Sequence, residues 1–160
     1  MINSKQFVIS IGKVALFCLV GLYLCRKMIT ILTPSAAILG VLDGQLVDCP
    51  DSPNCVSSQA HNYGHKTDPI RYTTSTVEAK AKLMGVLAAI PRVAILVEQP
   101  NYVHAEFRTA LLNYTDDVEF YFDEQNKIIH LRSASRLGHY DLGLNRKRVE
   151  EMSKRFNGVN

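Results

Sequence analysis

The sequence predicts an α+β fold: an antiparallel sheet of hairpin-linked strands packed with two helices, preceded by an N-terminal membrane helix. Three observations support this prediction. The chain begins with an apolar stretch, several later segments alternate apolar and polar residues with short turns between them, and a helix-like segment lies on either side of those segments. Strands that follow one another as hairpins form an antiparallel sheet, and helices outside the run cover one of its faces.

The apolar stretch covers residues 7–25 and contains one charged residue, Lys13, before Arg26 and Lys27. A transmembrane helix needs about 20 apolar residues, so the stretch is long enough. Signal peptidase cleaves after small residues, whereas bulky ones precede Arg26, and we therefore favour an uncleaved membrane anchor. A cleaved signal peptide and a buried helix of a soluble protein are the alternatives. Basic residues flank both ends, so they do not fix the orientation.

The chain is accordingly divided into three parts. Residues 1–27 form a membrane anchor or uncleaved signal, and residues 28–42 form an apolar linker interrupted by Pro34. Residues 43–160 form a single globular α+β domain, a length that suits one hydrophobic core.

Two helices are expected in the domain. The first covers 75–91, because Ser75 and Glu78 form a capping box and Pro91 ends the segment. Its apolar stripe contains Val77, Ala81, Met84 and Leu87. The second helix closes the chain, with Asn145 as its cap and Val149, Met152 and Phe156 on its inner stripe.

Strands are expected between these helices at 92–98, 102–109, 118–123 and 128–133, with an edge strand at 70–73. The segment 92–98 is largely apolar and is expected to be buried. In the others, alternation puts one set of side chains on the core face: Val103, Ala105, Phe107, Val118, Phe120, Phe122, Ile129 and Leu131. The opposite face receives Tyr102, His104, Glu106, Arg108, Glu119, Tyr121, His130 and Arg132. We interpret this second face either as a solvated surface with cross-strand ion pairs or as an open platform for a ligand.

Cys49 and Cys55 enclose a loop with two prolines and several turn-forming residues. In an exported protein such a pair is expected to form a disulfide. A zinc site that also uses His61 and His65, and a redox or nucleophilic thiol, are weaker alternatives, because a spacing of five intervening residues is unusual for either.

Charged residues gather in the last third of the chain. Arg146, Lys147 and Arg148 fall in the first turn of the predicted final helix, where cations oppose the helix dipole and need anionic partners. One interpretation is an internal charge network with the acids Asp116, Asp117, Glu119 and Asp141. The other is a site for an anionic ligand, formed by Arg132, Ser133, Ser135, Arg136, Arg146 and Arg148.

The sequence contains none of the common nucleophile, phosphate-loop or metalloprotease motifs. A hydrolase-like site made of Ser133, His139 and Asp141 is the alternative function, although spacing alone does not orient such a group. The net charge of +3 is too small to indicate a nucleic-acid partner. We expect a non-catalytic module without a cofactor or a bound metal. Its partners would be the membrane and an anionic small molecule, a lipid headgroup or a protein carboxylate.

Four stretches of the chain are similar to a known family: LGVLDGQL at 39–46, CPDSPNCVSSQ at 49–59, DDVEF at 116–120 and RSASRLGHYDLGLNRKRVE at 132–150. Together they resemble the domain of unknown function 1499 family over about residues 39–156. The resemblance implies a bacterial or plastid protein with an N-terminal signal or anchor, and it supplies no catalytic residue. With the membrane segment, it leads us to expect a domain on the periplasmic or other exported side of a bacterial inner membrane.

Overall fold

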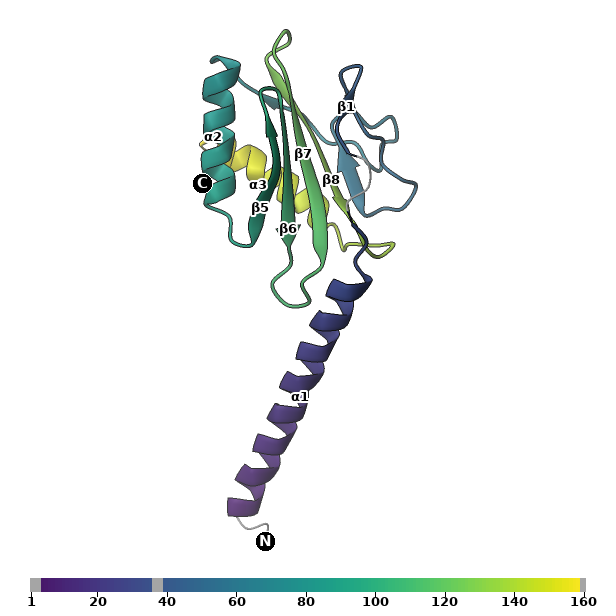
Figure 1. Ribbon diagram of the computed structural model, residues 1–160, viewed down its shortest axis with the longest axis vertical. Helices are drawn as coiled ribbons and strands as arrows, with labels where there is room; N and C mark the ends of the chain where they lie inside the picture. The colour runs from purple at the N-terminus through teal and green to yellow at the C-terminus, as the bar shows by residue number, and fades with distance from the viewer. Residues whose placement is uncertain (1–3, 36–38, 159–160) are drawn as a thin grey trace.

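The computed structural model describes residues 4–35 and 39–158. A long helix, α1 (Ser4–Leu32), extends away from a domain in which helices cover one face of a sheet (Figure 1). The predicted α+β fold is confirmed. Within α1, residues Ser10–Leu32 are long and apolar enough to cross a membrane. A helix of this length and composition near the N-terminus has the properties of a membrane anchor or of a signal sequence.

The first helix is longer than the sequence suggested. Residues 28–32, expected in the linker, continue α1, and Thr33 still donates its backbone N–H to the carbonyl of Ile29 at 2.9 Å. The helix ends just before Pro34, whose ring disfavours helical geometry in the residue that precedes it. The linker is therefore shorter than predicted.

The main sheet is antiparallel, with the strand order β3-β8-β7-β6-β5, and β4 pairs with the other end of β8. Its strands are β3 (Cys55–Ser57), β4 (Ile70–Arg71), β5 (Val93–Gln99), β6 (Tyr102–Arg108), β7 (Thr115–Asp123) and β8 (Ile128–Ser135). A separate hairpin of β1 (Val41–Leu42) and β2 (Gln45–Leu46) turns at Asp43 and Gly44, which both have positive φ. This hairpin and β3 were not predicted.

Helices α2 (Thr76–Ala88) and α3 (Leu144–Asn157) cover one face of the sheet (Figure 1). The predicted core face and the inner stripe of α3 are confirmed, because these side chains are buried together. The capping box of Ser75 and Glu78 is present. The stripe predicted for α2 is right at Leu87, which is buried, and at Met84, which packs against the core. It is wrong at Val77 and Ala81, which are exposed; Ala79 and Leu83 are buried instead.

Two further expectations are corrected. Strand β5 lies at an edge of the sheet and is mostly exposed, not buried, because β6 is its only partner in the strand order. Asn145 is not the cap of the last helix: Gly143, with a φ of 75°, holds the cap position, and Asn145 lies in the first turn, fully buried. The carboxylate of Asp141 accepts hydrogen bonds from the backbone N–H groups of Gly143 and Asn145, at 2.9 and 2.8 Å. The side chain of Asp141 therefore caps the helix.

The disulfide between Cys49 and Cys55 is confirmed. Because the two sulfur atoms bond each other, they are not available to a metal or as a nucleophile. The bridge joins the start of β3 to the loop before it and closes a short turn.

Replacing both cysteines with serine should lower the free energy of unfolding by about 2 kcal/mol, because the unfolded chain gains the freedom of a short open loop. Chemical unfolding of the purified chain in detergent measures this loss. The double change Cys18→Ser and Cys25→Ser, at the two free cysteines exposed on α1, is the control and should leave domain unfolding unchanged. Equal unfolding of the Cys49/Cys55 variant and the natural chain would contradict the prediction.

Candidate functional site

The sheet face opposite the helices is covered. The sequence had led us to expect either a solvated surface or an open platform there. His104, Glu106, Glu119 and Arg132 are buried there, and Glu119 is completely inaccessible. The segment after α1 lies over this face: the backbone N–H of Gly40 donates to Glu119 Oε1 at 2.9 Å. Charged groups removed from water need partners. Hydrogen bonds and ion pairs supply them on this face, except at Arg132 Nε, a buried atom with no hydrogen-bond partner among the described residues.

Glu119 is the centre of one half of that network. Tyr102 donates its hydroxyl to Glu119 Oε1 at 2.8 Å, and Arg132 Nη1 donates to Oε2 at 3.1 Å. Burial, and then the charge of Glu119, raises the pKa of Tyr102 well above its ordinary value, so the phenol remains a donor. Glu119 therefore forms a cross-strand ion pair with Arg132 and also fixes the segment that contains Gly40.

Asp117 is the centre of the other half. Arg136 binds both of its oxygens, at 2.8 and 2.7 Å, and His104 Nε2 lies 2.7 Å from Oδ1. Burial alone would raise the pKa of Asp117, but the hydrogen bonds from Arg136 and His104 outweigh it and lower the pKa. Arg136 also reaches Glu106 at 3.0 Å, and Arg108 pairs with the other oxygen of Glu106 at 2.6 Å.

A second polar cluster lies on the helix side of the sheet, where α3 begins. Asn145 is its hub: its Nδ2, which carries two hydrogens, lies 2.8–3.0 Å from the acceptors Asn54 O, Ser135 Oγ and Asp141 Oδ2, and its Oδ1 accepts from Ser133 at 2.6 Å. Asn54 extends the cluster to the next loop by donating to Gly138 O. Residues far apart in the sequence are thus joined by a buried, saturated network.

Arg148 connects this cluster to the sheet. Its Nη2 donates to Asp116, its Nη1 donates to Ser133 and Asn145, and its guanidinium lies over the ring of Phe107 at 5.1 Å. The internal charge network expected at the start of α3 therefore exists, and of its four candidate acids Asp116 is the one that meets Arg148. Because successive residues of a strand point to opposite faces, Asp116 and Asp117 serve different clusters.

The four arginines proposed as an anion site do not converge. Arg132 and Arg136 lie on the covered face, whereas Arg148 lies on the helix side. Arg146 donates to the backbone carbonyls of Lys66 and Gly64, at 2.8 and 2.9 Å. Each guanidinium already donates to a carboxylate or a carbonyl. The two serines, Ser133 and Ser135, belong to the Asn145 cluster.

The hydrolase-like group does not assemble either. Ser133 is fully buried and bonded to Asn145, Asp141 caps α3, and His139 is exposed. Among the residues that the structure describes, no hydrogen bond joins Ser133 to His139 or His139 to Asp141. These three side chains therefore lack the ordered contacts of a catalytic triad.

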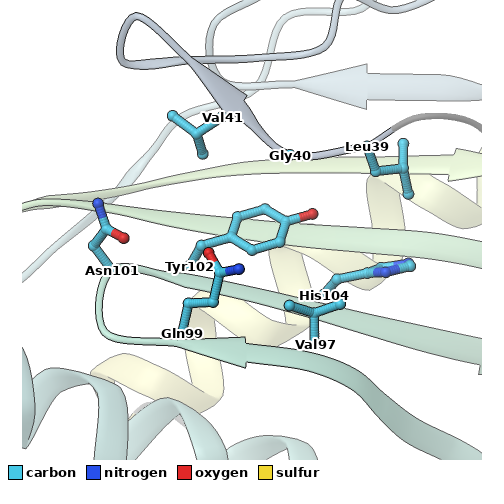
Figure 2. Close-up of a pocket in the computed structure, with 8 residues that line it drawn as sticks. All are labelled: Leu39, Gly40, Val41, Val97, Gln99, Asn101, Tyr102 and His104. Atoms are coloured by element: carbon cyan, nitrogen blue, oxygen red, sulfur yellow. The ribbon is translucent and has the colours of Figure 1, made fainter.

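A cavity of about 580 Å³ lies beside the network on the covered face. Its described lining is Leu39, Gly40, Val41, Val97, Gln99, Asn101, Tyr102 and His104. Figure 2 shows the Tyr102 ring between Asn101 at one end and His104 with Val97 at the other, under the segment 39–41. We call this cavity the linker pocket.

A β-bulge builds the wall of the linker pocket. The pairing of β5 with β6 shifts between Ile95 and Val97, so Ile95 lies opposite Ala105 on the core face, whereas Val97 lies opposite His104. Without the bulge, Val97 would point to the helix side of the sheet. The shift also brings Gln99 opposite Tyr102. No sequence pattern indicates this bulge, and the pocket residues on β5 were not predicted.

A comparison with protein-family models matches residues 45–156 to the family described as Protein of unknown function (DUF1499). The match covers more than two thirds of the chain. The chain belongs to this family. A search of curated proteins gives no match.

The DUF1499 match begins in the β1–β2 hairpin and ends in α3, so it contains the Asn145 cluster and the charged network. It leaves out α1 and the segment 39–41. One wall of the linker pocket thus comes from outside the matched region, and the rest of the pocket from inside it.

Stability of the DUF1499 domain should fall as the pH drops from 7 to 5, in part through His130. Burial lowers the pKa of His130, and its Nδ1 lies 3.2 Å from Ser58 Oγ, which itself accepts the backbone N–H of Leu131. Below the unfolded-state pKa of about 6.5, the unfolded chain takes up a proton that the folded domain resists, so folding becomes less favourable.

The measurement is the melting temperature of the natural chain and of His130→Gln between pH 5 and 7. The variant should show a weaker pH dependence, because aspartates titrate mainly below this range. Identical pH dependence in the two proteins would refute the role of His130.

Proposed function

We propose that the protein is a membrane-anchored, non-catalytic binding module, with its domain on the exported side, and that it holds a small polar molecule in the linker pocket. The anchor rests on α1, and the exported side is favoured by the Cys49–Cys55 disulfide, since such bonds persist in oxidising compartments. We choose the linker pocket as the ligand site because the β-bulge in β5 places Val97 and Gln99 in its wall.

The chemistry of the pocket defines the ligand class. Asp117 is held ionised and can only accept, so His104 Nε2 carries a proton and donates to it. The other ring nitrogen of His104, Nδ1, then remains for a ligand. The amides of Gln99 and Asn101 add donors and acceptors, and Val97 is an apolar wall. A ligand with several hydrogen-bonding groups and one apolar edge fits this set, and the volume is in the usual range for small-molecule sites.

We place the ligand here instead of on the arginine-rich motif because the arginines of that motif already have partners. An external anion would have to displace a buried carboxylate from Arg132, Arg136 or Arg148, and stranding that charge is costly. The described pocket lining has no serine, cysteine or lysine to act as a nucleophile, which favours binding over hydrolysis.

Filling the pocket should abolish ligand binding. Val97→Trp places a large ring in the cavity at a position that is already 36% exposed, so the core is not disturbed. Ile95→Trp is the matched control, because Ile95 is 37% exposed on the same strand but lies on the opposite face. Native mass spectrometry of each full chain, extracted from its own membranes in detergent, reports any co-purified small molecule.

We expect the natural chain and Ile95→Trp to carry the same small molecule and Val97→Trp to lack it. Gln99→Ala should reduce its occupancy. A molecule retained equally by Val97→Trp, or no bound molecule in any of the proteins, would contradict the proposed function.

A further inference from the structure

We propose a second interaction surface: the end of the domain nearest α1 rests on the bilayer that holds α1, with Leu111, Tyr140 and Leu142 in its headgroup region. This inference rests on the membrane anchor of the proposed function but not on the linker pocket. It differs from simple tethering, because a tethered domain can stand away from the membrane.

Hydrogen bonds fix the loop between β6 and β7 against the end of α1. Arg26 Nη1 donates to the carbonyls of Ala110 and Leu111, at 2.9 and 3.3 Å, and Asn113 donates to Thr30 at 3.2 Å. The loop therefore runs beside the last turns of α1, below its final residue. Its depth in a bilayer follows from the position of Arg26.

Residues 7–25 span about 28 Å as a helix, close to the hydrocarbon thickness of about 30 Å. Arg26 then lies where the hydrocarbon meets the headgroups, and Leu32, six residues further along the helix, lies about 9 Å higher. Each headgroup layer is about 5–8 Å thick. A loop bonded to Arg26 is thus at the base of this layer.

The side chains at this end suit that environment. Leu111 is 64% exposed in the β6–β7 loop, and Tyr140 and Leu142 are 65% and 80% exposed in the loop between β8 and α3. Both loops lie at the end of the domain from which α1 leaves (Figure 1). A cavity of about 390 Å³ lies between them, lined by residues of both loops. Large apolar side chains that converge on one end mark an interaction surface, and a tyrosine is favoured at the membrane interface.

Basic residues beside this surface also favour contact with lipid headgroups. A groove that shares Leu111 with the cavity is lined by Arg92, Arg108, Lys147 and Arg155, with Glu151 as its acid. Among the described residues, no salt bridge includes Arg92 or Lys147. Basic groups at the interface favour anionic headgroups.

The chain contains no tryptophan, so single substitutions provide clean fluorescent probes. Leu111→Trp and Leu142→Trp report on the proposed contact. Val77→Trp is the matched control, because Val77 is 78% exposed and α2 begins at the end of the domain away from α1 (Figure 1). Phe17→Trp reports whether α1 is inserted. Each full chain is reconstituted in vesicles of phosphatidylcholine and phosphatidylglycerol, with and without bromine on the acyl chains.

We expect brominated lipid to quench Leu111→Trp and Leu142→Trp several-fold more than Val77→Trp, as for side chains buried about 5–10 Å in the interface. Acrylamide in the water should show the reverse order. If Phe17→Trp is quenched but Leu111→Trp and Leu142→Trp match Val77→Trp, the anchor holds and the bilayer contact is refuted. If Phe17→Trp is not quenched, the anchor fails, and this inference fails with it.

Discussion

Two adjacent carboxylates, Asp116 and Asp117, are the constraint on which the architecture depends. Strand alternation sends them to opposite faces of β7, and both are almost fully buried. Neither can remain charged there without a cation, so each face must supply an arginine. Arg148 meets Asp116 and fixes the start of α3 on the core side, and Arg136 meets Asp117 on the other side. Of the cations that oppose the dipole of α3, Arg148 is explained by its partner Asp116, and Arg146 by the carbonyls of Lys66 and Gly64.

The same constraint shapes the candidate site. Glu119, two residues after Asp117, is buried on the same face and binds Arg132, Tyr102 and the backbone of Gly40. Through Gly40, the network anchors the segment that roofs the linker pocket. Through His104, it fixes which ring nitrogen remains for a ligand. The polar network and the pocket therefore share residues. The buried carboxylates Asp117 and Glu119 position the groups that would recognise a ligand.

Local patterns revealed most of the fold but less of the site. Alternation identified the core face of β6, β7 and β8, and the capping box identified the start of α2, because both depend on neighbours in sequence. The β1–β2 hairpin was missed although Asp43-Gly44 is a recognised turn signal. Burial of the polar face and the role of Asn145 depend on contacts across the chain, such as Asn145 with Asn54, which are 91 residues apart. The bulge in β5 leaves no trace in its apolar composition, so Val97 could not be assigned to a pocket.

A double-mutant cycle on Asp116 and Arg148 tests most directly whether the buried charge pair fixes α3 to the sheet. The side chains are 2% and 10% exposed, so Asp116→Asn or Arg148→Met alone should cost about 3–5 kcal/mol of unfolding free energy by stranding the other charge. The double change should cost far less than the sum. The exposed pair of Glu151 and Arg155 is the control, worth under about 1 kcal/mol. Small single effects at Asp116 and Arg148 that simply add would contradict the central role of the pair.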